Sequence, residues 1–594
     1  MSAVTAVVLA ACGNTGASTA APSADAGARN GTADGAVRGG TLNLLGSGDV
    51  DYMDPNVSYY SPSYLALRLW SRQLFTYPAD PANNTKAVPD LAEAVPTADN
   101  GGISADGKTY TISIRQGAQW GTTPARQVTA ADEVRGVKRT CNPVQPFGGL
   151  PDYQDLIVGF QQFCDGFKKV GQDAASIKNY VENTPLPGVT AKDDHTVVFT
   201  LNHPAAYLVD MLTLTAFSPA PVEVLDHLPG SSDLGTHQVS DGPYKIDLYD
   251  PTKRIEFSRN PAWNAASDPI RQAFVDKVVI DETVSQESTQ QQLQTGNANA
   301  DMEFDNFVPA AQIPGLQAAA DPNLNLGDTA SSNPYIVYNT RSPNNNSALG
   351  NVKVRQAISY AINRADIIQV LGGPEVSPPL THVLPPQIVG SKDSDPYPYD
   401  PAKAKQMLAD AGFPNGITLK LLYRNASAGS SKAFATVQQD LTKAGITVQG
   451  VPSPNADFYT KYLQVPDVAT RGVYDMAIAG WGADWYGNAA LSFFNPLFSG
   501  APSFPPVGSN FGYYDSQATN ALITQAIDAP DAATASDAWA KADAQVMADA
   551  AFFPITAPRQ PNYHAAQVHN AVYIPSFQGF DPSNVWLDKD KQGG

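Results

Sequence analysis

The sequence predicts an α/β fold with more than one domain. In the C-terminal half, a helix with Asp400 as N-cap and Gly412 as its stop precedes a strand at 417–421 and a helix at 433–444. Strands and helices that alternate in this way are typical of a sheet covered by helices. The chain has 594 residues, of which 43% are hydrophobic and 16% are charged. It is too long for a single core, so we expect two or three globular domains.

The remaining elements follow from local periodicity. Alternating apolar and polar residues predict strands at 41–45, 110–115, 195–201, 254–257 and 277–280. Apolar residues at helical spacing predict helices at 62–77 and 352–370. Another helix begins after Thr129, an N-cap residue that Asp132 follows three positions later, as in a capping box.

Acidic residues outnumber basic ones. There are 57 Asp and Glu against 38 Lys and Arg, which gives a net charge of −19 at pH 7. Such a surface repels nucleic acid and anionic membranes, so neither is an expected partner. Past the N-terminus, no segment reaches the roughly 18 unbroken apolar residues of a membrane-spanning helix.

The N-terminus has the pattern of an exported chain. A short apolar run within residues 1–12 ends in Leu-Ala-Ala-Cys12, and it predicts the remainder of a secretory signal, although no Lys or Arg precedes it. The motif resembles the lipobox of bacterial lipoproteins, which implies a lipid on Cys12. Residues 13–38 are mostly small and polar and predict a flexible tether. We expect the folded body outside the cell, anchored to the membrane; the alternative is a disordered start with a stray cysteine.

Two further cysteines are present, Cys141 and Cys164. In an exported chain an even pair is more often a disulfide than a metal site, so we predict a bridge between them. The seven histidines form no HExxH motif and there is no CxxC pair. Neither a metal site nor a cofactor is therefore expected.

The stretch 474–486 carries the candidate binding residues. Met476 and Ile478 alternate with small residues and predict a short strand, which Gly480 and Gly482 are expected to break. Three aromatic residues and one carboxylate lie close together here: Trp481, Asp484, Trp485 and Tyr486. An aromatic wall with one fixed charge suits a small cationic or zwitterionic ligand. The alternative is a core strand in which Trp481 is merely buried and Asp484 caps a following helix.

Five blocks of sequence, in order, resemble one bacterial family. They lie within 89–134, 241–263, 339–364, 399–413 and 474–486. They are similar to the extracellular solute-binding proteins of family 5, which serve ABC importers of peptides and nickel. The resemblance implies a two-lobed, type II periplasmic-binding-protein-like α/β fold with an extra domain inserted in the first lobe. The implied division is a first lobe of 39–58, 187–330 and 557–594, an inserted domain of 59–186 and a second lobe of 331–556, with a hinge near 330 and Pro554.

The resemblance also implies a function: a monomeric binding protein, not an enzyme, that captures peptides between its lobes and delivers them to a membrane permease. Asp484 matches the aspartate that holds a peptide's α-ammonium, and Trp481 matches the neighbouring tryptophan. Asn488 replaces the family's usual proline, which leaves peptide length and ligand class open. Asn339 and Tyr52 lie at segment ends that the family brings to the cleft.

Two alternatives remain. The same fold could bind a nickel chelate, an oligosaccharide or an opine, although Asp484 favours a ligand with an amine. An exported hydrolase is the other alternative, but the sequence contains no G-x-S-x-G motif and no metal motif.

Overall fold

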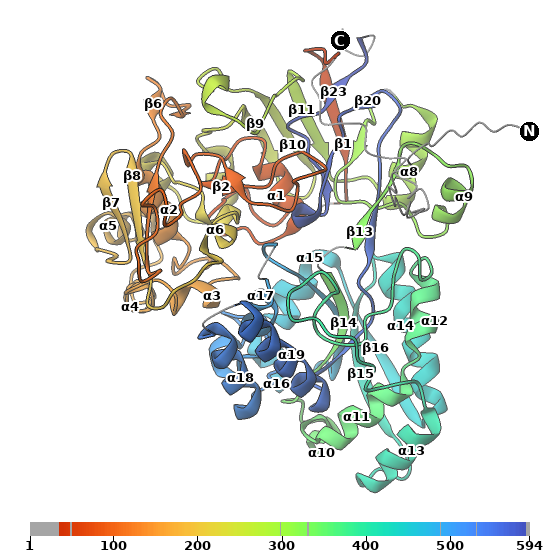
Figure 1. Cartoon of the computed structure of the whole chain (residues 1–594). Helices are drawn as coiled ribbons and strands as arrows, with labels where there is room; N and C mark the ends of the chain where they lie inside the picture. Colours follow the sequence, from red (N-terminus) through yellow and green to blue (C-terminus); the bar gives the residue numbers. More distant parts are fainter. Residues whose placement is uncertain are drawn as a thin grey trace, which may run out of the picture.

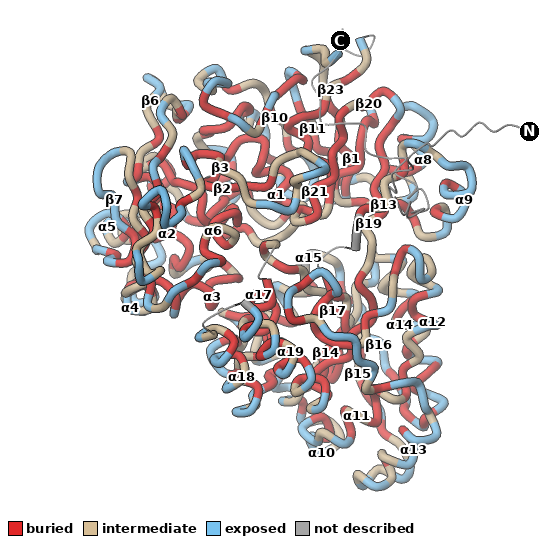
Figure 2. Tube along the Cα trace, in the orientation of Figure 1, coloured by how far each residue is buried: buried red, intermediate tan, exposed pale blue. Residues whose placement is uncertain are grey.

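Two lobes, joined on one side by a pair of strands, make up the molecule (Figure 1). The computed structural model describes residues 35–47, 50–297, 299–329, 332–486, 489–529 and 532–589. Cys12 and most of the predicted tether lie outside these residues. Buried residues follow the strands of both lobes, and exposed residues lie along the outer helices and loops (Figure 2).

Lobe one is built on a five-stranded sheet of order β12-β1-β11-β10-β9. Its strands are β1 (Thr41–Leu45), β9 (Tyr244–Asp250), β10 (Arg254–Arg259), β11 (Lys277–Asp281) and β12 (Met302–Glu303). β1 is parallel to β11 and β12, whereas β10 is antiparallel to both of its neighbours. The strands predicted at 41–45, 254–257 and 277–280 are confirmed, and the alternation that predicted them places Leu42 and Leu44 in the core.

A second sheet lies in the inserted region of the same lobe. β4 (Thr109–Ser113) pairs with β8 (Thr196–Thr200), which pairs with β7 (Val189–Asp193). The strands predicted at 110–115 and 195–201 are therefore confirmed. Because β7 and β8 complete the sheet that β4 begins, this sheet runs to Thr200, past the expected boundary at 186. The helix expected after Thr129 is α2 (Ala130–Arg139), and the backbone N–H of Thr129 donates to Asp132 as expected.

The helix predicted at 62–77 is wrong over most of its length. α1 ends early (Ser61–Leu67), and residues further on form β2 (Phe75–Thr76), which pairs with β3 (Val88–Pro89). The guanidinium of Arg68 explains the turn, because it donates to the hydroxyl of Thr76 and the carbonyl of Tyr77 and so holds the returning chain. This tertiary contact overrides the helical spacing of the leucines.

Lobe two is built on a sheet of order β16-β15-β17-β14-β18. Its strands are β14 (Ser332–Tyr338), β15 (Ile417–Arg424), β16 (Ile446–Ser453), β17 (Met476–Gly482) and β18 (Phe552–Pro554). The predicted helix at 401–411 is α13 (Pro401–Asp410), and the one at 433–444 starts earlier, as α14 (Ala428–Lys443), because Ser427 caps it. The helix predicted at 352–370 is two helices, α11 (Val352–Ala361) and α12 (Arg364–Val370), because Ile362 is extended and Asn363 caps the second.

The chain passes between the lobes twice, at neighbouring places. β13 (Leu324–Thr329) leads out of lobe one, and β19 (Arg559–Tyr563) leads back into it, antiparallel to β13 (Figure 1). On the other side of the crossing, β14 and β18 are also antiparallel neighbours. Two adjacent crossings of this kind suit a hinge, in which a few residues absorb the movement of whole lobes.

A disulfide joins Cys141 and Cys164 in the inserted region. Cys141 follows α2, Cys164 lies within α4 (Phe160–Phe167), and their Cα atoms are 5.5 Å apart. Both cysteines are buried among apolar residues. The bridge therefore fastens the loop between two helices to the core that both of them share. Within the described residues, the structure has no helix that is long and apolar enough to cross a membrane.

Candidate functional site

β17 carries the candidate site to the contact between the lobes. The strand pairs with β14 from Met476 to Gly482, and it keeps its extended form through both Gly480 and Gly482. The expectation that these glycines break the strand is wrong, because the hydrogen-bonded ladder with β14 continues past them. Asp484 follows two residues after the strand ends, at the edge that faces lobe one.

Asp484 is bound by a residue of the other lobe. The hydroxyl of Tyr59, just before α1, donates to Oδ2 of Asp484 over 2.7 Å. Burial raises the pKa of Asp484 to about 7, and the hydrogen bond from Tyr59 opposes that rise. No Lys or Arg forms an ion pair with Asp484 among the residues that the structure describes. Asp484 is thus a half-buried acid whose desolvation is only partly offset.

Aromatic rings from both lobes surround this carboxylate. Trp481 is half-buried, and its indole N–H donates to the carbonyl of Ser492 over 2.7 Å. The ring centroid of Tyr59 lies 5.9 Å from that of Trp481 and 4.8 Å from that of Phe147, in edge-to-face arrangements. The rings form an apolar, aromatic cluster beside the carboxylate, and such a cluster suits an organic ammonium.

A second buried carboxylate, Asp152, lies near Asp484. It belongs to α3 (Pro151–Gln154) of lobe one. The amide of Asn495, in α17 (Leu491–Phe498) of lobe two, donates to its Oδ1 over 2.7 Å, whereas its Oδ2 has no hydrogen-bond partner among the described residues. Burial raises the pKa of Asp152 well above its usual range, and the charge of Asp484 adds to the effect. The site therefore combines two acids that cannot both ionise without cost.

The other predicted residues take different places. Trp485 is fully buried in the apolar core, and Tyr486 is half-buried, with its backbone N–H donating to the hydroxyl of Tyr77 in lobe one over 2.8 Å. Asn339 is not at the site. It follows the end of β14 that pairs with Met476, opposite to the end near Asp484, and its amide donates to two main-chain carbonyls of lobe two, those of Ala469 and Tyr474.

Tyr52 lies beside the site's supporting residues instead of its carboxylate. The neighbouring Asp51 accepts hydrogen bonds from the backbone N–H of Tyr59 over 2.7 Å and from the hydroxyls of Ser58 and Ser63, each over 2.7 Å. Asp51 thus fixes the segment that presents Tyr59. Asn488 lies outside the described residues.

Sequence reasoning missed Tyr59, Phe147 and Asp152. They lie more than 300 residues before Asp484 in the sequence, and no short motif links them to it. Only the contact between the lobes brings them together. Side chains of types that can bind metals lie close together elsewhere in lobe one, at His227, Asp233 and His237.

Comparison with known proteins identifies the fold and the family. The sequence model described as "Bacterial extracellular solute-binding proteins, family 5 Middle" matches residues 86–504. The chain belongs to this family. Among family relatives, the glutathione-binding protein GsiB of Escherichia coli (strain K12) is 26% identical over 482 residues, which cover 80% of this chain and 82% of GsiB.

Solved structures agree with the family. Clavulanic acid biosynthesis oligopeptide binding protein 2 superposes with a TM-score of 0.77 at 25% identity, over 93% of this chain and 96% of its own. Haemophilus influenzae OppA, solved with the peptide RPPGFSPFR, gives a TM-score of 0.75 at 21% identity over 93% of this chain and all of its own. The two-lobed fold expected from the sequence is therefore confirmed.

Proposed function

We propose that this family 5 protein captures peptides between its lobes for an ABC importer, and that Asp484 holds the peptide's α-ammonium. The observation that carries the proposal is the half-buried, desolvated carboxylate of Asp484, whose pKa is raised to about 7 and which accepts a hydrogen bond from a hydroxyl of the opposite lobe. A cation that reached the carboxylate of Asp484 would replace the stabilising interaction with water that the carboxylate loses on burial.

The surroundings support an organic ammonium over a metal ion. The side chains beside Asp484 include aromatic rings from both lobes. Such rings offer contact area and cation–π attraction to a ligand without favouring one particular peptide side chain. The names of GsiB and of the oligopeptide-binding relative, both peptide binders, agree with such a ligand. The hydroxyl of Tyr59 donates to the carboxylate that would accept from a ligand's ammonium. The contact between the lobes and the binding of the ligand are therefore expected to use the same carboxylate, that of Asp484.

Blocking the peptide amine tests the ligand class. Calorimetric titration with a pool of short peptides should show binding, and the same pool after N-acetylation should bind at least about 100-fold more weakly, because acetylation removes the charge that pairs with Asp484. Equal binding of both pools would contradict the ammonium site and would point to a sugar, an opine or a metal chelate. Native mass spectrometry of protein from its own host would then identify the bound solute.

The pH dependence of binding is a second prediction. Below pH 7 Asp484 is protonated in the ligand-free protein, so the affinity for free peptides should fall about tenfold per pH unit as pH decreases. Above about pH 8 the affinity should fall again, because the peptide's α-amine, with an ordinary pKa of about 7.7–8.0, loses its charge. Stability of the ligand-free protein should take the opposite course. The folded-state pKa lies above the ordinary value of 3.8, so the folded state binds more protons and loses stability as pH rises from 3.8 to about 7. Titrations from pH 5 to 7, where the peptide amine stays charged, would show a flat profile if Asp484 does not bind the ligand.

Membrane anchoring through Cys12 is a third prediction. Cys12→Ser should move the protein from the membrane fraction to the soluble fraction of its host, because the lipid on Cys12 is the proposed attachment to the membrane. The double variant Cys141→Ser/Cys164→Ser is the control, since it removes the other two cysteines and should stay with the membrane. If Cys12→Ser remained in the membrane fraction, the lipid anchor would be refuted.

A further inference from the structure

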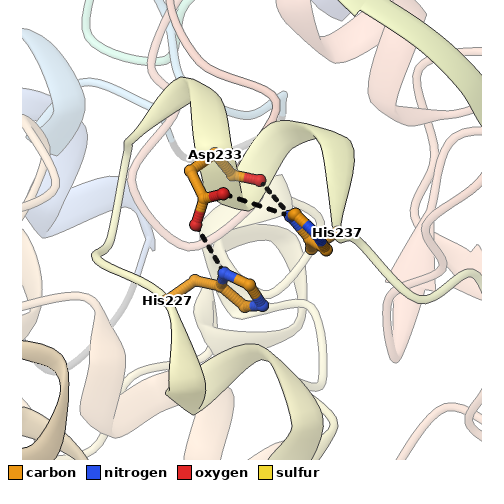
Figure 3. Close-up of side chains that lie close together, drawn as sticks. All are labelled: His227, Asp233 and His237. Atoms are coloured by element: carbon orange, nitrogen blue, oxygen red, sulfur yellow. Dashed lines mark hydrogen bonds and ion pairs between the residues drawn. The ribbon is translucent and has the colours of Figure 1, made fainter.

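Two histidines and an aspartate converge on the surface of lobe one (Figure 3). His227 follows the short helix Val222–Asp226, and Asp233 and His237 lie within and just after α7 (Ser232–Thr236). Their ligating atoms all lie within 4.8 Å of one another. Nδ1 of His227 is 2.6 Å from Oδ2 of Asp233, and Nδ1 of His237 is 3.4 Å from Oδ1 and 2.8 Å from the main-chain oxygen of the same aspartate.

We propose that His227, Asp233 and His237 form a binding site for a divalent transition-metal ion of the zinc type. Two imidazole nitrogens and a carboxylate are ligands that Zn²⁺ takes at about 2.0–2.2 Å, and three protein ligands leave one position for water or for a donor from outside the chain. Both Nδ1 atoms already face the same carboxylate, so only small side-chain rotations separate this arrangement from a coordination shell.

Local packing holds the three ligands in place. Leu234, next to Asp233, is fully buried in a small apolar cluster with Ala220 and Val224. Between His227 and Asp233, the backbone N–H of Gly230 donates over 3.1 Å to Asp54, whose carboxylate forms a buried ion pair with Arg139 at 2.7 Å. The ligand frame is therefore tied to the core at two points, which reduces the cost of ordering it around an ion.

The side chains are nevertheless open to solvent. Side-chain exposure is 22% for His227, 64% for Asp233 and 54% for His237, so an ion can enter without any movement of the fold. The net charge of −19 also raises the concentration of cations near the surface.

A second histidine–aspartate pair lacks the second imidazole of this cluster. His569 lies 2.6 Å from Asp588, the same distance as between His227 and Asp233, but the ring that stacks on His569, at 4.0 Å, is that of Trp586. The ring that stacks on His227, at 4.3 Å, is the imidazole of His237, which offers a further ligand. The cluster could not be predicted from the sequence, because five residues separate His227 from Asp233 and three separate Asp233 from His237, which matches no common metal motif.

Calorimetry with Zn²⁺ alone tests the site on full-length mature protein without a histidine tag. We expect one Zn²⁺ per chain, and we expect His227→Ala and His237→Ala each to weaken binding by about 10- to 100-fold or more. His569→Ala is the matched control, because its side-chain exposure of 21% equals that of His227 within one per cent, and it should bind Zn²⁺ like wild type.

Cobalt gives a second readout that separates ligation from general stability. Bound Co²⁺ should acquire visible absorption bands in wild type and in His569→Ala, and these bands should be lost in Asp233→Asn, a variant that keeps its shape. Peptide binding should survive in every variant with unchanged circular dichroism, so failure of the metal site and failure of the peptide proposal are distinguishable. Absence of Zn²⁺ binding in wild type, or unchanged binding in both histidine variants, would overturn the proposal.

Discussion

Asp484→Asn is expected to weaken the binding of free peptides by roughly 3–5 kcal/mol, or about two to four decades in affinity. Asparagine keeps the shape of the side chain and its bond with Tyr59, but it removes the charge that pairs with the α-ammonium. The ligand-free variant should unfold at a higher temperature than wild type at pH 7, because burial of the ionised carboxylate is a cost that asparagine does not carry. Calorimetric titration and thermal unfolding measure the two effects, which have opposite signs.

Two further variants separate the local charge from other causes. Asp467→Asn removes one charge from the same lobe, at an exposed pair with Arg471, and should leave peptide affinity within about twofold of wild type. Tyr59→Phe removes the hydroxyl that donates to Asp484 and should change affinity by only about 1–3 kcal/mol. If Asp484→Asn bound free peptides as tightly as Asp467→Asn does, Asp484 would not be the ammonium-binding residue.

Arg271→Met is expected to destabilise lobe one by roughly 3–5 kcal/mol, the usual cost of leaving buried charges unpaired. Arg271 contacts Asp90 at 2.9 Å and Asp268 at 3.4 Å, and all three side chains are fully buried. Although burial raises the pKa of Asp268, Arg271 and Arg72 together lower it to about 2. A folded-state pKa below the ordinary 3.8 stabilises the fold above that pH, and this stabilisation is lost as pH falls toward 2.

Urea unfolding at pH 7 measures the effect, with a probe that reports on lobe one. Arg254→Met is the matched control, because Arg254 belongs to β10 of the same lobe but pairs with Glu256 at 44% and 38% exposure. Its loss should cost no more than about 1 kcal/mol. Equal unfolding midpoints for the two variants would show that the buried network of Arg72, Asp90, Asp268 and Arg271 contributes no more than a surface pair.

Sequence periodicity predicted the sheets better than the helices and turns. Strands such as β1 and β11 bury every second side chain in the core, so apolar and more polar residues alternate in their sequence and can be recognised locally. The break between α11 and α12 was missed, because the apolar positions keep their helical spacing through Ile362 and Asn363. The two glycines of β17 predicted a break that does not occur. Small residues permit a turn, but pairing with a neighbouring strand decides whether a turn forms.

The candidate site was predictable only on its lobe-two side. Trp481 and Asp484 lie three residues apart, so their chemistry is visible as a short motif. Tyr59 and Asp152 approach Asp484 because two lobes meet, and the contact between distant parts of a chain leaves no local periodicity. The resemblance to the family led to Asp484 and to Asn339, but the structure places Asn339 at the far end of β14, where its amide donates to main-chain carbonyls inside lobe two.

The pairing of β14 with β18 makes lobe two an exchangeable cassette. Lobe two is one uninterrupted stretch of chain, and its first and last strands are hydrogen-bonded neighbours, with Tyr335 opposite Pro554. Only two adjacent junctions connect it to the rest, so recombination between relatives could replace it without rethreading lobe one. Such a chimera would keep Tyr59 and Asp152 and receive a new residue in place of Asp484. Each half of the candidate site can thus diversify in evolution separately from the other.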